Sequence, residues 1–339
     1  MNLYVINFAY LIASVLFILG LIGLTSPRTA RRGNILGSLG MLVAVVATLG
    51  DKQIIGFELI LLGLGIGALI GAIAAVKVQM TAMPEMVAIF NGFGGGASAL
   101  VAATAVLAPQ MAQGVPEVQL YASSVASTLI GAVTLTGSMI AFLKLAEKLK
   151  FQPTGAAYQS LSIGSGLIAI LLAVYYVTDP SQTWVFWAVT AVAGLYGILL
   201  TASVGGADMP VVIALLNSMS GLAAAATGFV LHYNVLILAG SLVGASGLIL
   251  TKIMCDAMNR SLIDVMRGDL GGAAAAGPSA DDVYAGRIKS AGPDEIAMLF
   301  DTAEQVAVVP GYGMAVAQAQ HAVRDLANLL EARGIEVVY

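Results

Sequence analysis

Nine long apolar stretches constrain the fold of this chain more than any other feature of its sequence. A transmembrane helix needs about 20 consecutive, mostly apolar residues. Such stretches lie at about residues 3–24, 34–50, 54–76, 83–108, 119–145, 160–178, 184–203, 208–231 and 234–257. Only 10% of all residues are charged, whereas soluble domains carry about 25%. The sequence therefore predicts an α-helical polytopic membrane domain of nine spans over residues 1–262.

The basic residues lie almost entirely at one end of these spans. If the odd-numbered spans end on that side, it carries Arg28, Arg31, Arg32, Lys77, Lys144, Lys148, Lys150, Lys252, Arg260 and Arg267. The opposite side carries Lys52. Because basic loops stay on the cytoplasmic side of a membrane, we expect the N-terminus outside and the C-terminal region in the cytoplasm. Residues 1–24 lack a basic leading segment and a cleavage pattern, so we expect the first span there and not a signal peptide.

Three polar side chains are predicted to lie at one depth inside the membrane. With a rise of about 1.5 Å per residue, Asn91 lies about 12 Å from the cytoplasmic side, Asn217 about 13 Å and Ser138 about 15 Å. Polar groups in a membrane usually face the bundle interior or a water-filled path, which favours a hydrated half-channel open to the cytoplasm. The alternative is that these side chains are hydrogen-bonding contacts between helices. Asparagine does not titrate, so a proton route through two of them needs ordered water.

Asp208 opens the eighth span at its predicted cytoplasmic end. A carboxylate at this position, with Pro210 in the first turn, is typical of a helix N-terminus, and one interpretation is therefore an N-cap. The other interpretation is a contact with a soluble domain, and the two are compatible. Glu85 is expected at the membrane interface, and Glu58 is a candidate for the outer end of a proton path.

The composition changes after about residue 262. Residues 263–282 form a Gly/Ala-rich linker, and residues 283–339 are ordinary soluble sequence that reads as strand, helix, strand. The strands are expected at 305–309 and 335–339, and the helix at 314–333, where apolar residues recur at helical spacing. The fold class is therefore a polytopic helical membrane domain followed by a truncated, Rossmann-like α/β segment.

A glycine turn joins the first of these strands to the helix. It comprises Gly311, Tyr312, Gly313, Met314, Ala315 and Val316. Strand, glycine turn and helix form a site for pyrophosphate in dinucleotide-binding domains, but valine replaces the third glycine of the usual fingerprint, so an ordinary turn is equally consistent with the pattern. One such unit does not bury both faces of a sheet, so we expect either a truncated chain or a partner that completes the domain.

The reactive residue types are sparse. A single cysteine, Cys255, excludes a disulfide framework, and His232 and His321 are too far apart to suggest a local metal motif. We therefore expect no metal site, no catalysis by a side-chain nucleophile and no nucleic-acid partner.

Several strings in the chain resemble one membrane protein family. They are MPEMVAIFNGF (83–93), IGAVTLTGSMIAFLKL (130–145), GGADMPVVIALLNSMSG (205–221), GASGLILTKIMCDAMNRS (244–261) and PGYGMAVAQAQ (310–320). They are similar to the β subunit of the proton-translocating NAD(P) transhydrogenase. The resemblance covers the chain from about residue 20 to its end.

The resemblance implies a function and a set of partners. The family passes hydride between NAD(H) and NADP(H), coupled to proton movement across the membrane, here driving NADPH formation. It implies NADP(H) on this subunit and NAD(H) on a partner α subunit, which also supplies further membrane helices. It further implies a dimer of αβ units in the lipid bilayer of a bacterial cytoplasmic (inner) membrane.

The resemblance also assigns roles to individual residues. It places Asn91, Ser138 and Asn217 on the proton route. It places Asp208 at the membrane surface facing the NADP(H) domain, and Arg260 in the segment that joins the two domains. Gly311, Gly313 and Val316 match the nucleotide-binding loop, in which this valine is normal for the family.

Two departures from the family pattern matter. Many members have a histidine at the position of Asn91, so the titrating group is unassigned, and a histidine on the α subunit is a plausible substitute. A complete NADP(H) domain is also longer than residues 278–339, so we expect an incomplete site in this chain. Two other function classes compete with this one. The first is a solute or ion transporter with a regulatory nucleotide-sensing tail, which the lack of an internal repeat disfavours. The second is a structural membrane subunit.

Overall fold

A computed structural model describes residues 3–50, 57–109, 114–268, 292–311, 314 and 319–339. Within those residues, nine helices are long and apolar enough to cross a membrane. They are α1 (Leu3–Leu24), α2 (Pro27–Leu49), α3 (Glu58–Lys77), α4 (Met83–Leu107), α5 (Glu117–Leu145), α6 (Ala156–Thr178), α7 (Thr183–Ala202), α8 (Met209–Leu231) and α9 (Asn234–Ala257). The prediction of about nine spans is confirmed.

The second helix begins earlier than its apolar stretch predicts. The sequence predicts a span from residue 34, whereas α2 starts at Pro27. Proline suits the first position of a helix because its ring fixes φ and its missing N–H needs no partner there. Arg28, Arg31 and Arg32 therefore lie on the first turns of a helix and not in a loop.

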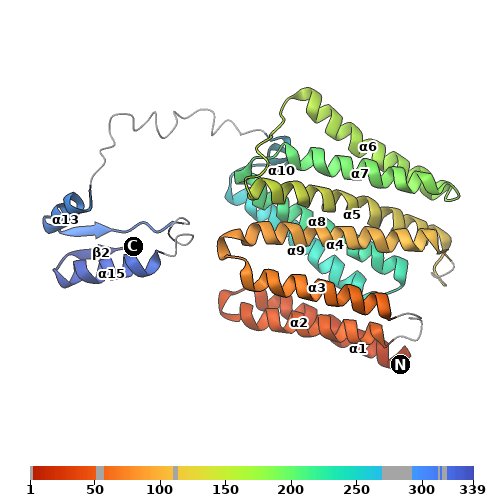
Figure 1. Cartoon of the computed structure of the whole chain (residues 1–339), viewed down its shortest axis with the longest axis horizontal. Helices are drawn as coiled ribbons and strands as arrows, with labels where there is room; N and C mark the ends of the chain where they lie inside the picture. The colour runs from red at the N-terminus through yellow and green to blue at the C-terminus, as the bar shows by residue number, and fades with distance from the viewer. Residues whose placement is uncertain (1–2, 51–56, 110–113, 269–291, 312–313, 315–318) are drawn as a thin grey trace. The chain divides into compact units, whose positions relative to one another are not determined.

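The helices lie roughly parallel to one another, with α5 at the centre of the packing (Figure 1). Helix α5 packs against α4, α6, α7 and α8, while α1 pairs with α2 and α8 pairs with α9. Helices α5 and α8 are the most buried of the nine. By contrast, no residue of α3 is buried.

Glycines allow the closest of these helix contacts. A Cβ added at Gly131 of α5 would collide with the carbonyl oxygen of Gly95 on α4, and one at Gly221 of α8 would lie 2.5 Å from the amide nitrogen of Gly244 on α9. Small residues let two backbones approach in this way, and van der Waals contact and hydrogen bonding then hold the pair together in a membrane.

Two short elements line the end of the helical unit that carries most of the basic residues. A 3-10 turn, η3 (Gly206–Asp208), precedes α8, and helix α10 (Leu262–Arg267) follows α9. Ser261 caps α10 by accepting a hydrogen bond from the amide of Asp264 at 3.1 Å, and Val265 is fully buried in an apolar cluster with Val204 and Met209. Residues 262–268 are thus structured against the membrane helices, where the sequence suggested the start of a linker.

The remaining elements form a separate small unit. The chain divides into Met1–Val78 with Ala82–Gly272, and Gln79–Thr81 with Ala273–Tyr339; a short 3-10 turn, η1 (Met80–Ala82), precedes α4. The second unit contains α13 (Pro293–Asp301), β1 (Gln305–Ala307), α15 (Gln320–Ala332) and β2 (Glu336–Val338). The two strands pair in parallel, with Gln305 opposite Glu336. Both are shorter than predicted, and α13 was not predicted.

Candidate functional site

Three polar side chains meet in the interior of the helical unit, one from each of α4, α5 and α8. The side-chain amide of Asn91 donates a hydrogen bond to the hydroxyl of Ser138 at 3.0 Å. The hydroxyl of Ser220 donates to the side-chain oxygen of Asn91 at 2.6 Å. Asn91 and Ser138 are buried. The predicted proximity of Asn91 and Ser138 is therefore present as a direct contact.

A glycine next to Asn91 explains how the two helices come this close. A Cβ added at Gly92 would lie 3.1 Å from the Cβ of Ser138, which is tighter than most real contacts. With no side chain at Gly92, α4 and α5 approach closely enough for the short asparagine side chain to reach across.

Asn217 lies one helical turn from this contact, and its side chain does not join it. Its backbone carbonyl accepts a hydrogen bond from the Ser220 hydroxyl at 2.8 Å, and its own half-buried side chain makes no hydrogen bond within the described residues. The third member of the polar cluster is therefore Ser220, one helical turn further along α8. Helical spacing places Asn217 and Ser220 on one face, and that spacing was the available signal for Ser220.

A second polar contact lies deeper along the same three helices. The hydroxyl of Ser127 on α5 lies 2.8 Å from that of Thr227 on α8 and within hydrogen-bond distance of the carbonyl oxygens of Ser98 and Ala223. Ser127 is fully buried. Sequence reasoning missed this contact because serine and threonine are common in membrane helices and give no signal of which residues face each other.

Asp208 forms a short ion pair with Arg260. The Oδ2 atom of Asp208 lies 2.5 Å from Nη1 of Arg260. The side chain of Asp208 is 4% exposed and that of Arg260 is 19% exposed. The second carboxylate oxygen of Asp208 is buried and has no hydrogen-bond partner within the described residues. Asp208 is the N-cap residue of α8, but its carboxylate makes no capping hydrogen bond to the first turn. Its charge is instead directed to the segment that follows α9.

The backbone between α7 and α8 is held by several neighbouring side chains. Lys144 at the end of α5 donates to the carbonyl oxygens of Ala202 and Val204 at 2.5 and 2.7 Å. The hydroxyl of Ser203 donates to the carbonyl oxygen of Met266 in α10 at 3.2 Å. An ammonium group suits the unsatisfied carbonyls at a helix C-terminus. The loop that carries Asp208 is thus fixed to both α5 and α10.

Little of the predicted nucleotide loop lies within the described residues. Tyr312, Gly313, Ala315 and Val316 are outside them. Gly311 is exposed beyond the carboxyl end of β1, and the amide of Met314 donates to its carbonyl oxygen at 3.1 Å. A Cβ at Gly311 would meet no atom within 4 Å, so the backbone here is open to a ligand.

The remaining acidic candidates do not form a cluster. Glu58 is exposed on α3, and one carboxylate oxygen of Glu85 is buried without a hydrogen bond inside the described part of the chain. Across the same residues, no group of three His, Cys, Asp or Glu side chains is placed to hold a metal ion.

These features define an integral membrane protein with a polar contact among its central helices and a buried ion pair at one end. The sequence matches the family model for the NAD(P) transhydrogenase beta subunit over residues 6–339. It is 43% identical over 339 residues to NAD(P) transhydrogenase subunit beta of Rhodospirillum rubrum, covering 98% of this chain and 72% of that protein. A second Rhodospirillum rubrum sequence of the same name gives the same values. The chain belongs to the family of NAD(P) transhydrogenase β subunits, which confirms the resemblance.

Proposed function

We propose that the contact of Asn91, Ser138 and Ser220 is part of the proton route of this transhydrogenase, and that Asp208 and Arg260 couple that route to the nucleotide-binding domain. The chain is a β subunit of NAD(P) transhydrogenase and acts as part of a complex. In this family, hydride transfer between NAD(H) and NADP(H) is coupled to proton translocation. The buried hydrogen bonds across α4, α5 and α8 carry the proposal.

The chemistry of these side chains suits proton conduction through water. A serine hydroxyl both donates and accepts a hydrogen bond, and an asparagine side chain does the same through two different atoms. Neither titrates, so they orient water molecules and do not store the proton. Polar groups buried in a membrane are costly and tend to mark ion or proton paths. For the titrating group, our candidate is a histidine of the α subunit.

The ion pair suits a role in coupling. Asp208 lies directly before α8, the helix that also carries Asn217 and Ser220. Arg260 lies between α9 and α10, in the segment that leads toward the second unit. Breaking a buried ion pair leaves an uncompensated charge, which costs about 3–5 kcal/mol. If Asp208 is paired with Arg260 in one conformational state and not in another, the two states differ by an energy of this size. That difference is large enough to couple the proton route to the nucleotide site.

The second unit is our candidate for the NADP(H)-binding domain, with a Rossmann-like arrangement. Supporting this are the parallel pairing of β1 and β2, helix α15 between them in the sequence, and the open backbone at Gly311. Gly311, Tyr312, Gly313, Met314, Ala315 and Val316 would hold the pyrophosphate through backbone N–H groups. The bound nucleotide supplies the hydride chemistry; the residues of this chain bind and orient it.

Helix α3 is our candidate for the contact with the α subunit. It buries no residue, and a Cβ added at Gly63, Gly67 or Gly71 would meet no atom within 4 Å. A stripe of small residues lets another helix approach closely. Membrane helices of the α subunit would fill this face, and the complex would be a dimer of αβ units. The uneven basic residues support an inner-membrane orientation with the N-terminus outside.

Replacing Asn91 by leucine in a transhydrogenase with a complete NADP(H) domain, assembled with the α subunit, tests the proton route. The variant loses both hydrogen bonds, so we expect an assembled complex with hydride transfer in detergent but little proton uptake in liposomes. The matched control is Asn7→Leu, because Asn7 is exposed on α1. If proton uptake in the Asn91→Leu variant equals that of the control, the route lies elsewhere. If the complex fails to assemble, the milder Ser138→Ala variant decides between a route and a packing contact.

A further inference from the structure

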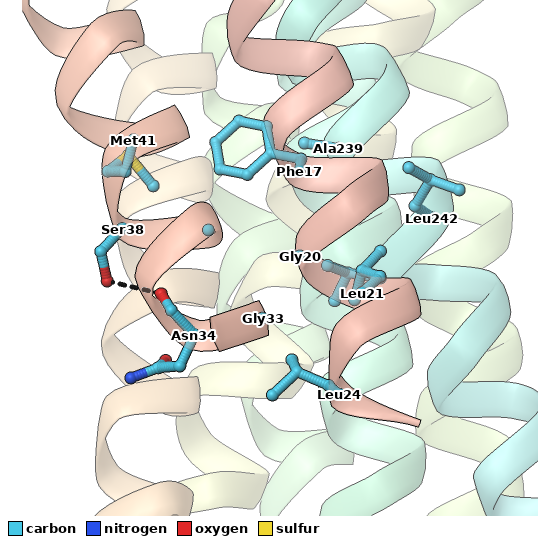
Figure 2. A pocket seen from close by; sticks show the side chains of 12 residues that line it. Phe17, Gly20, Leu21, Leu24, Gly33, Asn34, Ser38, Met41, Ala239 and Leu242 are labelled. Atoms are coloured by element: carbon cyan, nitrogen blue, oxygen red, sulfur yellow. Dashed lines mark hydrogen bonds between the residues drawn. The ribbon is translucent and has the colours of Figure 1, made fainter. Parts of the chain in front are cut away.

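A cavity of about 390 Å³ lies between α1, α2 and α9, away from the polar contact described above. Its walls include Phe17, Leu21, Asn34, Ser38, Met41 and Leu242 (Figure 2). Ligand sites in proteins typically have volumes of about 300–1,000 Å³. The cavity is thus large enough for a ligand, and its lining is mostly apolar.

Glycines shape the wall that α1 and α2 contribute. The two helices touch through their backbones, since a Cβ at Gly33 would lie 2.6 Å from the carbonyl oxygen of Gly20. One turn further along α2, a Cβ at Gly37 would meet no atom within 4 Å, although Gly37 lines the cavity. The space beside Gly37 is therefore not filled by any described side chain.

One face of α2 changes from basic to apolar, and its two arginines precede the residues that line the cavity. Arg28 and Arg31 come first, Asn34 and Ser38 follow, and Met41 is last, at spacings of three or four residues that place them on one helix face. Both arginines are exposed and make no ion pair within the described residues. The sequence of α1 and α2 contains no Asp or Glu. This face offers positive charge, then two polar side chains, then apolar surface; the Ser38 hydroxyl donates to the carbonyl oxygen of Asn34 at 2.9 Å and is free to accept.

We infer that this cavity binds one anionic phospholipid. The phosphate contacts Arg28 and Arg31 at the membrane surface, where basic residues attract anionic lipid headgroups. Asn34, about 5 Å below Arg31 along the helix, lies nearest the glycerol esters, and one acyl chain packs along Ser38 and Met41. An amphiphile with an anionic head matches the change of character along this face.

The bound lipid would fill the gap where α9 separates from the α1–α2 hairpin. At one end of α9, Val235 is buried against α1 and Tyr233 contacts the ring of Tyr10 with centroids 5.7 Å apart. Further along α9, at Leu242, the cavity lies between the helices. An acyl chain there restores the missing van der Waals contacts, which are individually small and collectively large.

Native mass spectrometry of the complex with the α subunit tests the inference. The complex is incubated with equal amounts of dioleoyl phosphatidylglycerol and dioleoyl phosphatidylcholine before detergent dilution. We expect the wild type to retain one phosphatidylglycerol per β subunit in preference to phosphatidylcholine. Replacing Arg28 and Arg31 by glutamine lowers that preference about fivefold for each arginine, because one basic residue near the surface contributes about 1 kcal/mol. The matched control, Lys150→Gln, leaves the preference unchanged.

A second variant fills the cavity without disturbing the fold. Gly37→Leu places its side chain in the open space, and we expect it to abolish retention of both lipids. The control is Gly164→Leu on α6, where an added Cβ also meets no atom within 4 Å. Equal retention of the two lipids by the wild type, or full retention by Gly37→Leu, would overturn the inference.

A thiol placed at the cavity distinguishes the lipid from a protein occupant. Cys255 is buried and is the one cysteine of the chain, so Ser38→Cys in a Cys255→Ser background leaves one thiol in the β subunit. We expect a fluorophore on that thiol to be quenched more by brominated phosphatidylglycerol than by brominated phosphatidylcholine. Efficient cross-linking of the thiol to the α subunit or to a second β subunit would show a protein in the cavity and refute the proposal.

Discussion

The ion pair between Asp208 and Arg260 gives the sharpest prediction. Asp208→Asn keeps the size of the side chain and removes its charge. An exposed ion pair contributes about 0–1 kcal/mol, and loss of one partner from a fully buried pair costs about 3–5 kcal/mol. With side-chain exposures of 4% and 19%, this pair lies between those limits. We expect the contact of α10 with the membrane helices to weaken by about 2–3 kcal/mol.

Hydrogen–deuterium exchange of the αβ complex measures this change locally. The amide of Val265 is bonded to the carbonyl of Ser261, and that of Gly268 to the carbonyl of Val265, so their exchange reports opening of α10. Each 1.4 kcal/mol is tenfold in an equilibrium constant. In Asp208→Asn, these amides should therefore exchange about 30- to 150-fold faster, while amides within α5 keep their rates.

Two comparisons make this reasoning refutable. Asp301→Asn breaks an exposed ion pair with Arg333 of 2.9 Å and should change local exchange little. The double variant Asp208→Asn/Arg260→Gln leaves neither charge without its partner. Arg260→Gln should therefore speed amide exchange in α10 less in the Asp208→Asn background than in the wild type. Unchanged exchange in Asp208→Asn, or fully additive effects in the double variant, would show that the pair does not hold α10 in place.

Three further substitutions have expected outcomes. Ser220→Ala removes the donor to Asn91; proton uptake by liposomes should fall while hydride transfer in detergent persists, and equal loss of both would argue against a proton route. Gly197→Ala puts a Cβ 2.5 Å from the carbonyl oxygen of Val133; the melting temperature should fall by an amount equivalent to about 1–3 kcal/mol. Lys144→Met leaves two carbonyl oxygens at the end of α7 without their donor; thermal unfolding should show a loss of about 1–3 kcal/mol.

The membrane helices could be predicted because the bilayer leaves few choices. A run of about 20 apolar residues must satisfy its own backbone hydrogen bonds in lipid, and an α-helix does so within one segment. The start of α2 was misplaced because hydropathy excludes arginine from a span. A helix can nevertheless begin before the apolar stretch, with long basic side chains reaching the interface, and Pro27 marked that start.

The contacts between helices could not be predicted in the same way. Depth placed Asn91, Ser138 and Asn217 at one level, but depth does not fix the rotation of a helix about its axis. That rotation depends on crossing points such as Gly92, and it brought Ser220 to Asn91. The pairing of Asp208 with Arg260 joins residues 52 positions apart, which no local spacing encodes. The resemblance named both residues without giving their contact.

The glycine contacts divide the centre of the membrane unit into two stiff pairs of helices. Backbone contact at Gly131 locks α5 to α4, and backbone contact at Gly221 locks α8 to α9, so neither pair has room to slide internally. The hydrogen bond from Ser220 to Asn91 crosses the seam between the pairs. The contact of Ser127 with Thr227 crosses the same seam, so rocking of one pair on the other changes both of these hydrogen bonds. The polar contact therefore stands at a place where movement between the two halves is converted directly into a change of hydrogen bonding.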